Sequence, residues 1–295
     1  MENDIYAHNN YYCRMKKNLI NRPLTSREYK IMLLPREFND IEKGIGKLKS
    51  IFDSKVDKKV EWATEIEVSN RKRTWFVDSA EFDLFKKNKF ILRIRQGLRT
   101  GEVETTVKCR HPDRYISASH DLSSVSKSLV VKFEEDISIP FVSQFSLSGT
   151  FRKNKLPNLN KFNDLKRCFP KIRIKEIHEN EPLKTVNNFK PDEISYNIGS
   201  IKLTDKKSIE MYLNLWYSGS ENKTTKPLIV ELTFNCEAKK LNEKNQRCLE
   251  EYSISLLKQA NKFYLQLQND RIADHTTTTT KTEFAYTYKR SIDLS

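Results

Sequence analysis

Residues 90–96, FILRIRQ, decide how this chain folds, because charged and apolar side chains alternate from Leu92 onward. A β-strand points successive side chains to opposite faces, so residues two apart share a face. Arg93 and Arg95 therefore lie on one face of the predicted strand, and Leu92 and Ile94 lie on the other. Such a strand belongs to a sheet with one face packed against apolar residues and the other face in a polar environment.

Four other stretches repeat this alternation of ionic and apolar residues. They contain Glu28 and Lys30 (26–33), Glu104, Thr106 and Lys108 (102–109), Lys132, Glu134 and Asp136 (129–139), and Lys171, Arg173 and Lys175 (171–177). Alternation alone leaves open whether the ionic face lines a barrel lumen or a solvated exterior. Two features favour the lumen. Amphipathic helices predicted at 35–52 and 241–267 need outward apolar faces to cover, and the charges mix both signs, as a metal-assisted phosphate site requires.

The whole pattern predicts an α+β fold, a closed antiparallel eight-stranded β-barrel (a tunnel) with flanking helices. An N-terminal tail covers 1–24, and the barrel domain covers 25–290 with an insertion at about 140–170. Within that insertion, 158–169 has the pattern of a short helix, and a helical turn is expected at 83–87. The stretches read as strands are 26–33, 74–78, 90–96, 102–109, 129–139, 171–177, 193–203, 209–217 and 228–236.

Composition narrows the partners of this chain. The net charge of +14 over 295 residues implies an anionic partner. No apolar run of about 18 residues occurs and the first ten residues lack a secretory pattern, so we expect a cytoplasmic protein without a membrane span. The five cysteines include no CxxC pair, and the five histidines no HxH or HxxxH spacing, which argues against a zinc site. No helix-turn-helix, zinc-finger or stacking-aromatic motif occurs, which disfavours nucleic acid. No P-loop or Gly-rich dinucleotide pattern occurs either.

Short motifs follow one another in a specific order. They are Ser26-Arg27-Glu28-Tyr29-Lys30, Trp75-Phe76-Val77-Asp78, Leu92-Arg93-Ile94-Arg95, Thr106-Val107-Lys108, Lys132-Phe133-Glu134-Glu135-Asp136, Lys171-Ile172-Arg173, Leu213-Asn214, Glu231-Leu232-Thr233 and Lys281-Thr282. In this order they resemble the CYTH domain family, or triphosphate tunnel metalloenzymes, from about Thr25 to Tyr286. Three acids of the family pattern are replaced, by Ser26, Asn214 and Thr233.

The resemblance implies a basic tunnel that takes a triphosphate or polyphosphate small molecule together with Mg²⁺ or Mn²⁺. It implies catalytic roles for Glu28 and Lys30. The implied phosphate-binding residues are Lys30, Arg93, Arg95, Lys108, Lys132, Arg173 and Lys281. The implied metal ligands are Glu28, Glu134, Asp136 and Glu231.

Two functions are therefore expected, and they differ in whether chemistry occurs. The first is metal-dependent hydrolysis of inorganic triphosphate, thiamine triphosphate or a nucleoside triphosphate. The alternative is a catalytically weak or inactive domain that binds polyphosphate or a phosphorylated ligand, which the three replaced acids favour. Cyclisation of ATP, another activity of the family, has no base-recognition feature in these strands to support it.

Overall fold

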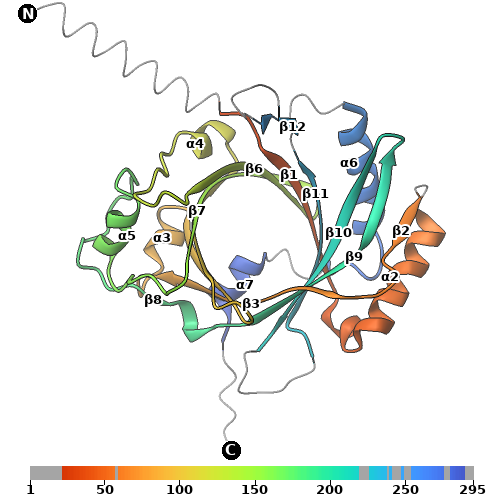
Figure 1. Ribbon diagram of the computed structural model, residues 1–295, viewed down its shortest axis with the longest axis horizontal. Coiled ribbons are helices and arrows are strands. Elements are labelled where there is room, and N and C mark those ends of the chain that lie inside the picture. Colours follow the sequence, from red (N-terminus) through yellow and green to blue (C-terminus); the bar gives the residue numbers. More distant parts are fainter. Residues whose placement is uncertain are drawn as a thin grey trace, which may run out of the picture.

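The computed structural model describes residues 22–56, 59–218, 226–237, 239–240, 247–248, 254–275 and 280–289. Its centre is a closed barrel of nine strands, in the order β9-β10-β11-β1-β6-β7-β5-β4-β3 and back to β9 (Figure 1). These strands are β1 (Ser26–Leu33), β3 (Val68–Asp78), β4 (Phe90–Gly97), β5 (Val103–His111), β6 (Val130–Ser138), β7 (Val142–Lys153), β9 (Asp192–Thr204), β10 (Lys207–Tyr217) and β11 (Ile229–Glu237). The expected closed barrel with flanking helices is confirmed.

The barrel differs from the expected one in two details. It has nine strands, and one neighbouring pair, β1 and β6, runs parallel, with Ser26 opposite Glu134 and Glu28 opposite Asp136. The other neighbours in the barrel are antiparallel. Three shorter strand pairings lie outside the barrel. They involve β2 (Val60–Trp62) on β9, β8 (Lys184–Thr185) on β3, and the pair β12 (Lys239–Lys240) and β13 (Arg247–Cys248).

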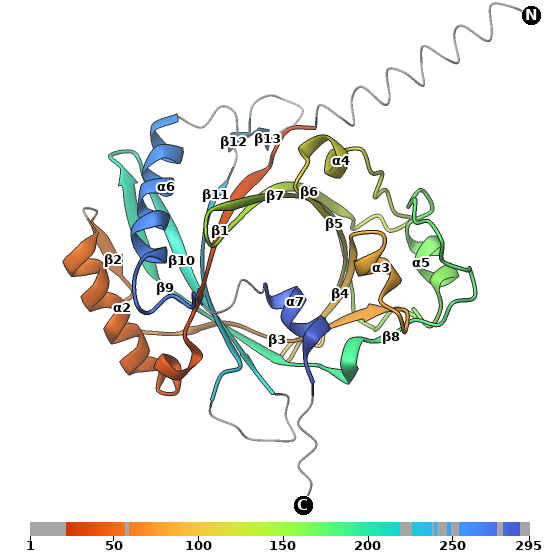
Figure 2. The same cartoon turned by 180° about the vertical axis from the view of Figure 1, so that it is seen from behind.

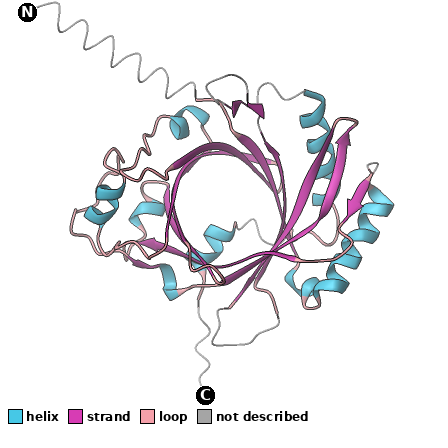
Figure 3. Cartoon of the chain, viewed as in Figure 1, coloured by secondary structure: helices cyan, strands magenta, loops and turns pink. Residues whose placement is uncertain are grey.

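Most helices lie outside the ring of strands (Figure 3). A 3₁₀ turn η1 (Pro35–Phe38) leads into α2 (Ile41–Lys55), and α6 (Ile254–Gln268) lies beside the same wall. The Asp40 side chain caps α2 by accepting a hydrogen bond from the Lys43 backbone N–H at 3.1 Å. The shorter helices are α3 (Asp83–Lys86), α4 (Arg114–Ala118), α5 (Phe162–Cys168), η2 (Val186–Asn188) and α7 (Lys281–Thr287).

The apolar faces of the strands point outward and form the main core with these helices. Tyr29, fully buried, stacks on Phe234 of β11 at 4.6 Å and contacts Tyr264 of α6 at 5.5 Å. Phe52 of α2 contacts Phe263 of α6 at 5.5 Å. Because the apolar face of β1 is buried under helices, Glu28 and Lys30 on its other face point into the lumen. The ionic face therefore lines the inside, as the helix pattern predicted.

One strand expected from the sequence is absent, and one strand was missed. Residues 171–177 form no strand. At Lys175 the backbone bonds to the Asn88 side chain instead of to a neighbouring strand: its N–H donates to Asn88 Oδ1 at 2.9 Å, and its carbonyl accepts from Asn88 Nδ2 at 3.1 Å. Conversely, the expected insertion at 140–170 contains β7, a full barrel strand between β6 and β5. The helix expected at 241–267 is present only as α6 from Ile254 onward: Arg247–Cys248 is strand β13, and the rest of 241–253 lies outside the described residues.

Two further points concern the ends of the chain and its helices. The N-terminal tail expected at 1–24 lies outside the described residues up to position 21. None of the described helices is both long enough and apolar enough for a membrane crossing.

Candidate functional site

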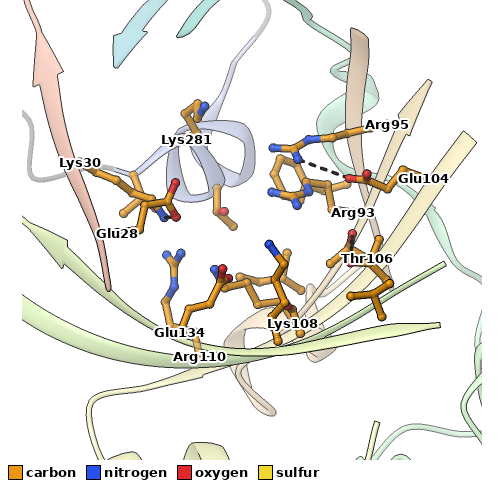
Figure 4. A pocket seen from close by; sticks show the side chains of 18 of the residues that line it. Glu28, Lys30, Arg93, Arg95, Glu104, Thr106, Lys108, Arg110, Glu134 and Lys281 are labelled. Atoms are coloured by element: carbon orange, nitrogen blue, oxygen red, sulfur yellow. Dashed lines mark hydrogen bonds and ion pairs between the residues drawn. The ribbon is translucent and has the colours of Figure 1, made fainter. Parts of the chain in front are cut away.

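The lumen of the barrel contains a cavity of about 600 Å³, within the range of roughly 300–1,000 Å³ that small-molecule sites occupy. Side chains from opposite walls point into this space (Figure 4). Its charged lining comprises eight cations and four carboxylates: Lys30, Arg93, Arg95, Lys108, Arg110, Lys132, Arg152 and Lys281 against Glu28, Glu104, Glu134 and Glu231. The excess of cations gives the cavity a positive potential, which suits a polyanion.

The two arginines of β4 differ in their partners. Arg95 contacts Glu104 at 3.5 Å and Glu193 at 3.7 Å. Among the described residues, no hydrogen-bond or ion-pair partner contacts the Arg93 guanidinium, whose Nε is buried. Burial, reinforced by the neighbouring Arg95, lowers the pKa of Arg93 to about 10. Arg93 is still charged at neutral pH, so its unpaired cation is available to an incoming anion.

Asp136 of β6 holds three of the lumen cations together. Its carboxylate accepts from Lys30 at 2.9 Å, Lys108 at 3.0 Å and Arg110 at 3.1 Å. Burial opposes ionisation of this carboxyl, but the nearby cations outweigh it and hold the pKa of Asp136 well below its ordinary value. Asp136 is therefore an internal counter-ion that arranges the basic wall.

Glu28 shares Lys30 with Asp136, at a Lys30 Nζ to Glu28 Oε2 distance of 2.8 Å. Burial opposes ionisation of Glu28 as well, yet Lys30 prevails and the pKa of Glu28 is lowered. For Lys30 burial is outweighed by Asp136 and Glu28, which raise its pKa. At neutral pH the pair is a carboxylate beside an ammonium group, and both groups line the cavity.

Helix α7, which follows the last barrel strand in the chain, places Lys281 in the lumen. Thr280 caps the helix, since its Oγ1 accepts from the Glu283 N–H and its own N–H donates to the Glu283 carboxylate. Lys281 Nζ then lies 2.7 Å from Glu231 and 3.0 Å from Glu193. The Tyr286 hydroxyl donates to buried Asp78 at 2.9 Å and holds α7 across part of one barrel opening (Figure 2).

The structure brings together most of the residues expected at the site. Those that line the cavity are Glu28, Lys30, Arg93, Arg95, Lys108, Lys132, Glu134, Glu231 and Lys281. Asp136 lies just behind them, bound to the cations, and Lys132 is exposed. Arg173 is a correction: it is exposed in the irregular segment 171–177 and does not line the cavity. Without a strand at 171–177, no barrel position exists for its side chain.

Four charged lumen residues were absent from the expected site. Glu104 shares the two-residue period of Thr106 and Lys108 within the predicted strand, although it was given no role, and Arg110 continues this period once β5 is extended to His111. Arg152 on β7 pairs with Glu104 on the neighbouring β5 at 3.1 Å, and β7 was not expected as a strand. Glu193 accepts from Trp216 Nε1 at 2.7 Å, and its signal was only the polar period of Glu193, Ser195 and Asn197 in β9.

A second cavity, of about 430 Å³, adjoins the first in the lumen. The two share four lining residues, Glu28, Arg95, Glu231 and Lys281. On this side the positions where the family pattern has acids carry Asn214 and Thr233, which bond to each other through Asn214 Nδ2 and Thr233 Oγ1 at 3.2 Å. Within the described residues, no three His, Cys, Asp or Glu side chains converge into a metal cluster.

Comparison with known proteins gives few matches. No family model matches the chain, and no curated protein matches its sequence. Among solved structures, a Hippeastrum protein described as a candidate adenylyl cyclase with a dominant triphosphatase activity matches with a TM-score of 0.41 and 12% identity, covering 88% of this chain and 93% of its own. A candidate adenylate cyclase from Vibrio parahaemolyticus matches with a TM-score of 0.35 and 11% identity, covering 89% and 98%. At these values the likeness assigns the chain neither a family nor a function.

Proposed function

We propose that this protein binds a small molecule bearing a triphosphate group in the lumen of its barrel. The observation that carries this proposal is Arg93, an unpaired guanidinium in a cavity lined by twice as many cations as carboxylates. An unpaired buried charge is costly to a fold, so its retention favours a ligand that neutralises it. A triphosphate supplies several negative charges along a short chain of oxygens, which suits a lumen with cations on several walls.

The cations fall into two groups by their present partners. Arg93 and Lys132 have no carboxylate within ion-pair distance among the described residues, so they are free to bind phosphate oxygens directly. Lys30, Lys108 and Lys281 already pair with carboxylates and share their remaining N–H groups with the phosphates. Charge-assisted hydrogen bonds of this kind are the strong ones, and guanidinium groups bind phosphate in bidentate fashion.

The carboxylates of the lumen suit a divalent cation that binds together with the triphosphate. Mg²⁺ retains several waters and is commonly held by one or two carboxylates together with substrate phosphates. Glu28 and Glu231 line both cavities, and Glu134 has no cation partner among the described residues, so these three would hold Mg²⁺ or Mn²⁺. Asp136 does not suit this role, because Lys30, Lys108 and Arg110 occupy its oxygens. When bound, the ion would neutralise phosphate charge.

Hydrolysis of the triphosphate is a second candidate function, and the Glu28–Lys30 pair favours it. Glu28 is ionised at neutral pH and lines the cavity, and among the described residues only Lys30 contacts its carboxylate. In this candidate Glu134 and Glu231 would hold the ion, which leaves the other oxygen of Glu28 to accept a proton from a water and to orient that water toward the terminal phosphate. Lys30 would counter the charge that develops on the phosphate oxygens.

One pair of measurements tests both candidates. Calorimetric titration with inorganic triphosphate and with nucleoside triphosphates, in Mg²⁺, Mn²⁺ or EDTA, measures binding. Phosphate release from the same compounds measures hydrolysis. Binding without release would leave the binding function and remove the hydrolytic one. A folded protein that binds none of these compounds would overturn the proposal.

A further inference from the structure

The second cavity of the lumen has a different chemical character from the first. Six of its lining residues are uncharged hydrogen-bonding side chains: Ser69, Asn70, Ser195, Tyr212, Asn214 and Thr233. Its charged lining balances, with three cations, Lys72, Arg95 and Lys281, against three carboxylates, Glu28, Glu193 and Glu231. The first cavity has eight cations against four carboxylates. A polyanion therefore prefers the first cavity, and the second suits an uncharged polar group.

A chain of neutral hydrogen bonds crosses the wall of the second cavity on three neighbouring strands. Ser195 Oγ on β9 donates to Asn214 Oδ1 on β10 at 2.6 Å, and Asn214 Nδ2 donates to Thr233 Oγ1 on β11 at 3.2 Å. After these bonds, the Thr233 hydroxyl proton and the second Asn214 N–H remain as donors. The Asn214 and Ser195 oxygens keep accepting capacity. The wall can thus both donate to and accept from hydroxyl or amide groups of a ligand.

Tyr212 adds an aromatic surface to this cavity. It lies two residues before Asn214 on β10 and lines the same space. Its hydroxyl donates to Glu210. Tyr212 thus adds an aromatic ring to the lining beside the neutral hydrogen-bonding wall, and aromatic rings stack on planar organic groups.

We infer that the ligand is a triphosphate monoester, whose phosphates lie in the first cavity and whose uncharged, hydrogen-bonding organic group lies in the second. The inference rests on the proposed function, because the first cavity must hold the phosphates. The junction supports it: Glu28, Arg95, Glu231 and Lys281 line both cavities, so one ligand reaches from one to the other. Inorganic triphosphate would leave the neutral wall without a partner.

The test compares inorganic triphosphate with the four ribonucleoside triphosphates as probes, by calorimetric titration with Mg²⁺ present. At least one ribonucleoside triphosphate should bind about tenfold or more tightly than inorganic triphosphate, the equivalent of about one net hydrogen bond. Asn214→Leu and Tyr212→Leu should each abolish most of that difference while changing the affinity for inorganic triphosphate less than about twofold. Circular dichroism of each variant checks that the barrel is folded.

The outcomes separate the inference from the proposed function. If no probe binds the folded natural protein, the proposed function fails and the inference fails with it. If inorganic triphosphate binds as tightly as every ester, or if both variants lose the two ligand types equally, the inference alone is overturned. Should Asn214→Leu fail to fold, Thr233→Val removes one hydroxyl from the same wall with little change of shape and gives the same comparison.

Discussion

Arg93 and Arg95 lie two residues apart on the same face of β4, yet only Arg95 contacts carboxylates, Glu104 and Glu193. Arg95 is therefore part of the internal charge network of the lumen. Arg93 has no such partner among the described residues, and burial together with Arg95 lowers its pKa to about 10. Two residues that look alike in the sequence thus have different roles. Under the proposed function, Arg95 would contribute to the fold as well as to ligand binding, and Arg93 to ligand binding alone.

Replacing Arg93 should separate binding from stability. Arg93→Ala removes an unpaired buried cation, so we expect unchanged or slightly higher stability in urea unfolding. Triphosphate affinity should fall about ten- to hundredfold, because one charge-assisted hydrogen bond contributes about 1.5–3 kcal/mol. Calorimetric titration measures the affinity. Arg173→Ala is the matched control, since Arg173 is exposed and outside the cavity. Equal affinity in Arg93→Ala and Arg173→Ala would contradict the role of Arg93.

Asp136 should be the most sensitive acid for stability. Asp136→Asn leaves Lys30, Lys108 and Arg110 close together without their shared counter-ion. Breaking a buried ion pair by removing one partner costs about 3–5 kcal/mol, and urea unfolding at neutral pH should show a loss of that order. Glu134→Gln is the control on the same strand, because Glu134 accepts only from Ser26 among the described residues. The account of Asp136 fails if both variants are equally stable.

Glu104 provides a prediction about pH. Burial raises the pKa of this carboxyl, but Arg95 and then other cations outweigh it and bring the pKa of Glu104 down to about 2. A carboxyl whose pKa is lower in the folded state contributes stability above its ordinary value, about 4.3, and loses it as pH falls toward 2. The free energy of unfolding of the natural protein should therefore exceed that of Glu104→Gln by about 2–3 kcal/mol at neutral pH. That difference should shrink between about pH 4.5 and pH 2. A constant difference over this range would refute the ion-pair account.

A strand could be predicted from the sequence where charged residues occupy its lumen face. In β1, β4, β5 and β6 the charged residues alternate with apolar ones, and these strands were predicted almost to their ends. In β7 the lumen positions carry Ser146, Ser148 and Thr150, which resemble loop residues in composition. One partner, β6, directly precedes it, with Ser138 opposite Val142, but the polar lumen residues hid the alternation that would have distinguished this strand from an insertion.

The opposite error occurred at 171–177, where alternation was present without a strand. Ile172 is buried while Lys171 and Arg173 are exposed, so the period of two is real. A single irregular segment on the surface produces the same period, because one side contacts the core and the other meets water. Only hydrogen bonds to a neighbouring strand separate the two cases, and here Asn88 takes those bonds. The same alternation, together with the resemblance, led to the inclusion of Arg173 in the expected site.

The three replaced acids provide the last prediction, because carboxylates at these positions would raise the affinity of the lumen for divalent metal. Ser26 donates to Glu134 at 3.1 Å, and Asn214 and Thr233 bond to each other, so all three lie on the lumen face. The combined change Ser26→Glu, Asn214→Asp and Thr233→Glu would add three carboxylates to a cation-rich lumen, where nearby Lys and Arg compensate them. Folding should survive, and affinity for Mn²⁺ without any triphosphate should rise at least tenfold, since hard divalent cations bind carboxylate oxygens. Direct titration with Mn²⁺ measures this rise.

The same variant should lose the preference for triphosphate esters over inorganic triphosphate, because the neutral wall becomes anionic. As a control, three Gln-to-Glu or Asn-to-Asp changes at exposed positions such as Asn154 alter net charge without entering the lumen. If the control raises Mn²⁺ affinity as much as the lumen variant does, the effect is one of net charge, and positions 26, 214 and 233 do not face a metal.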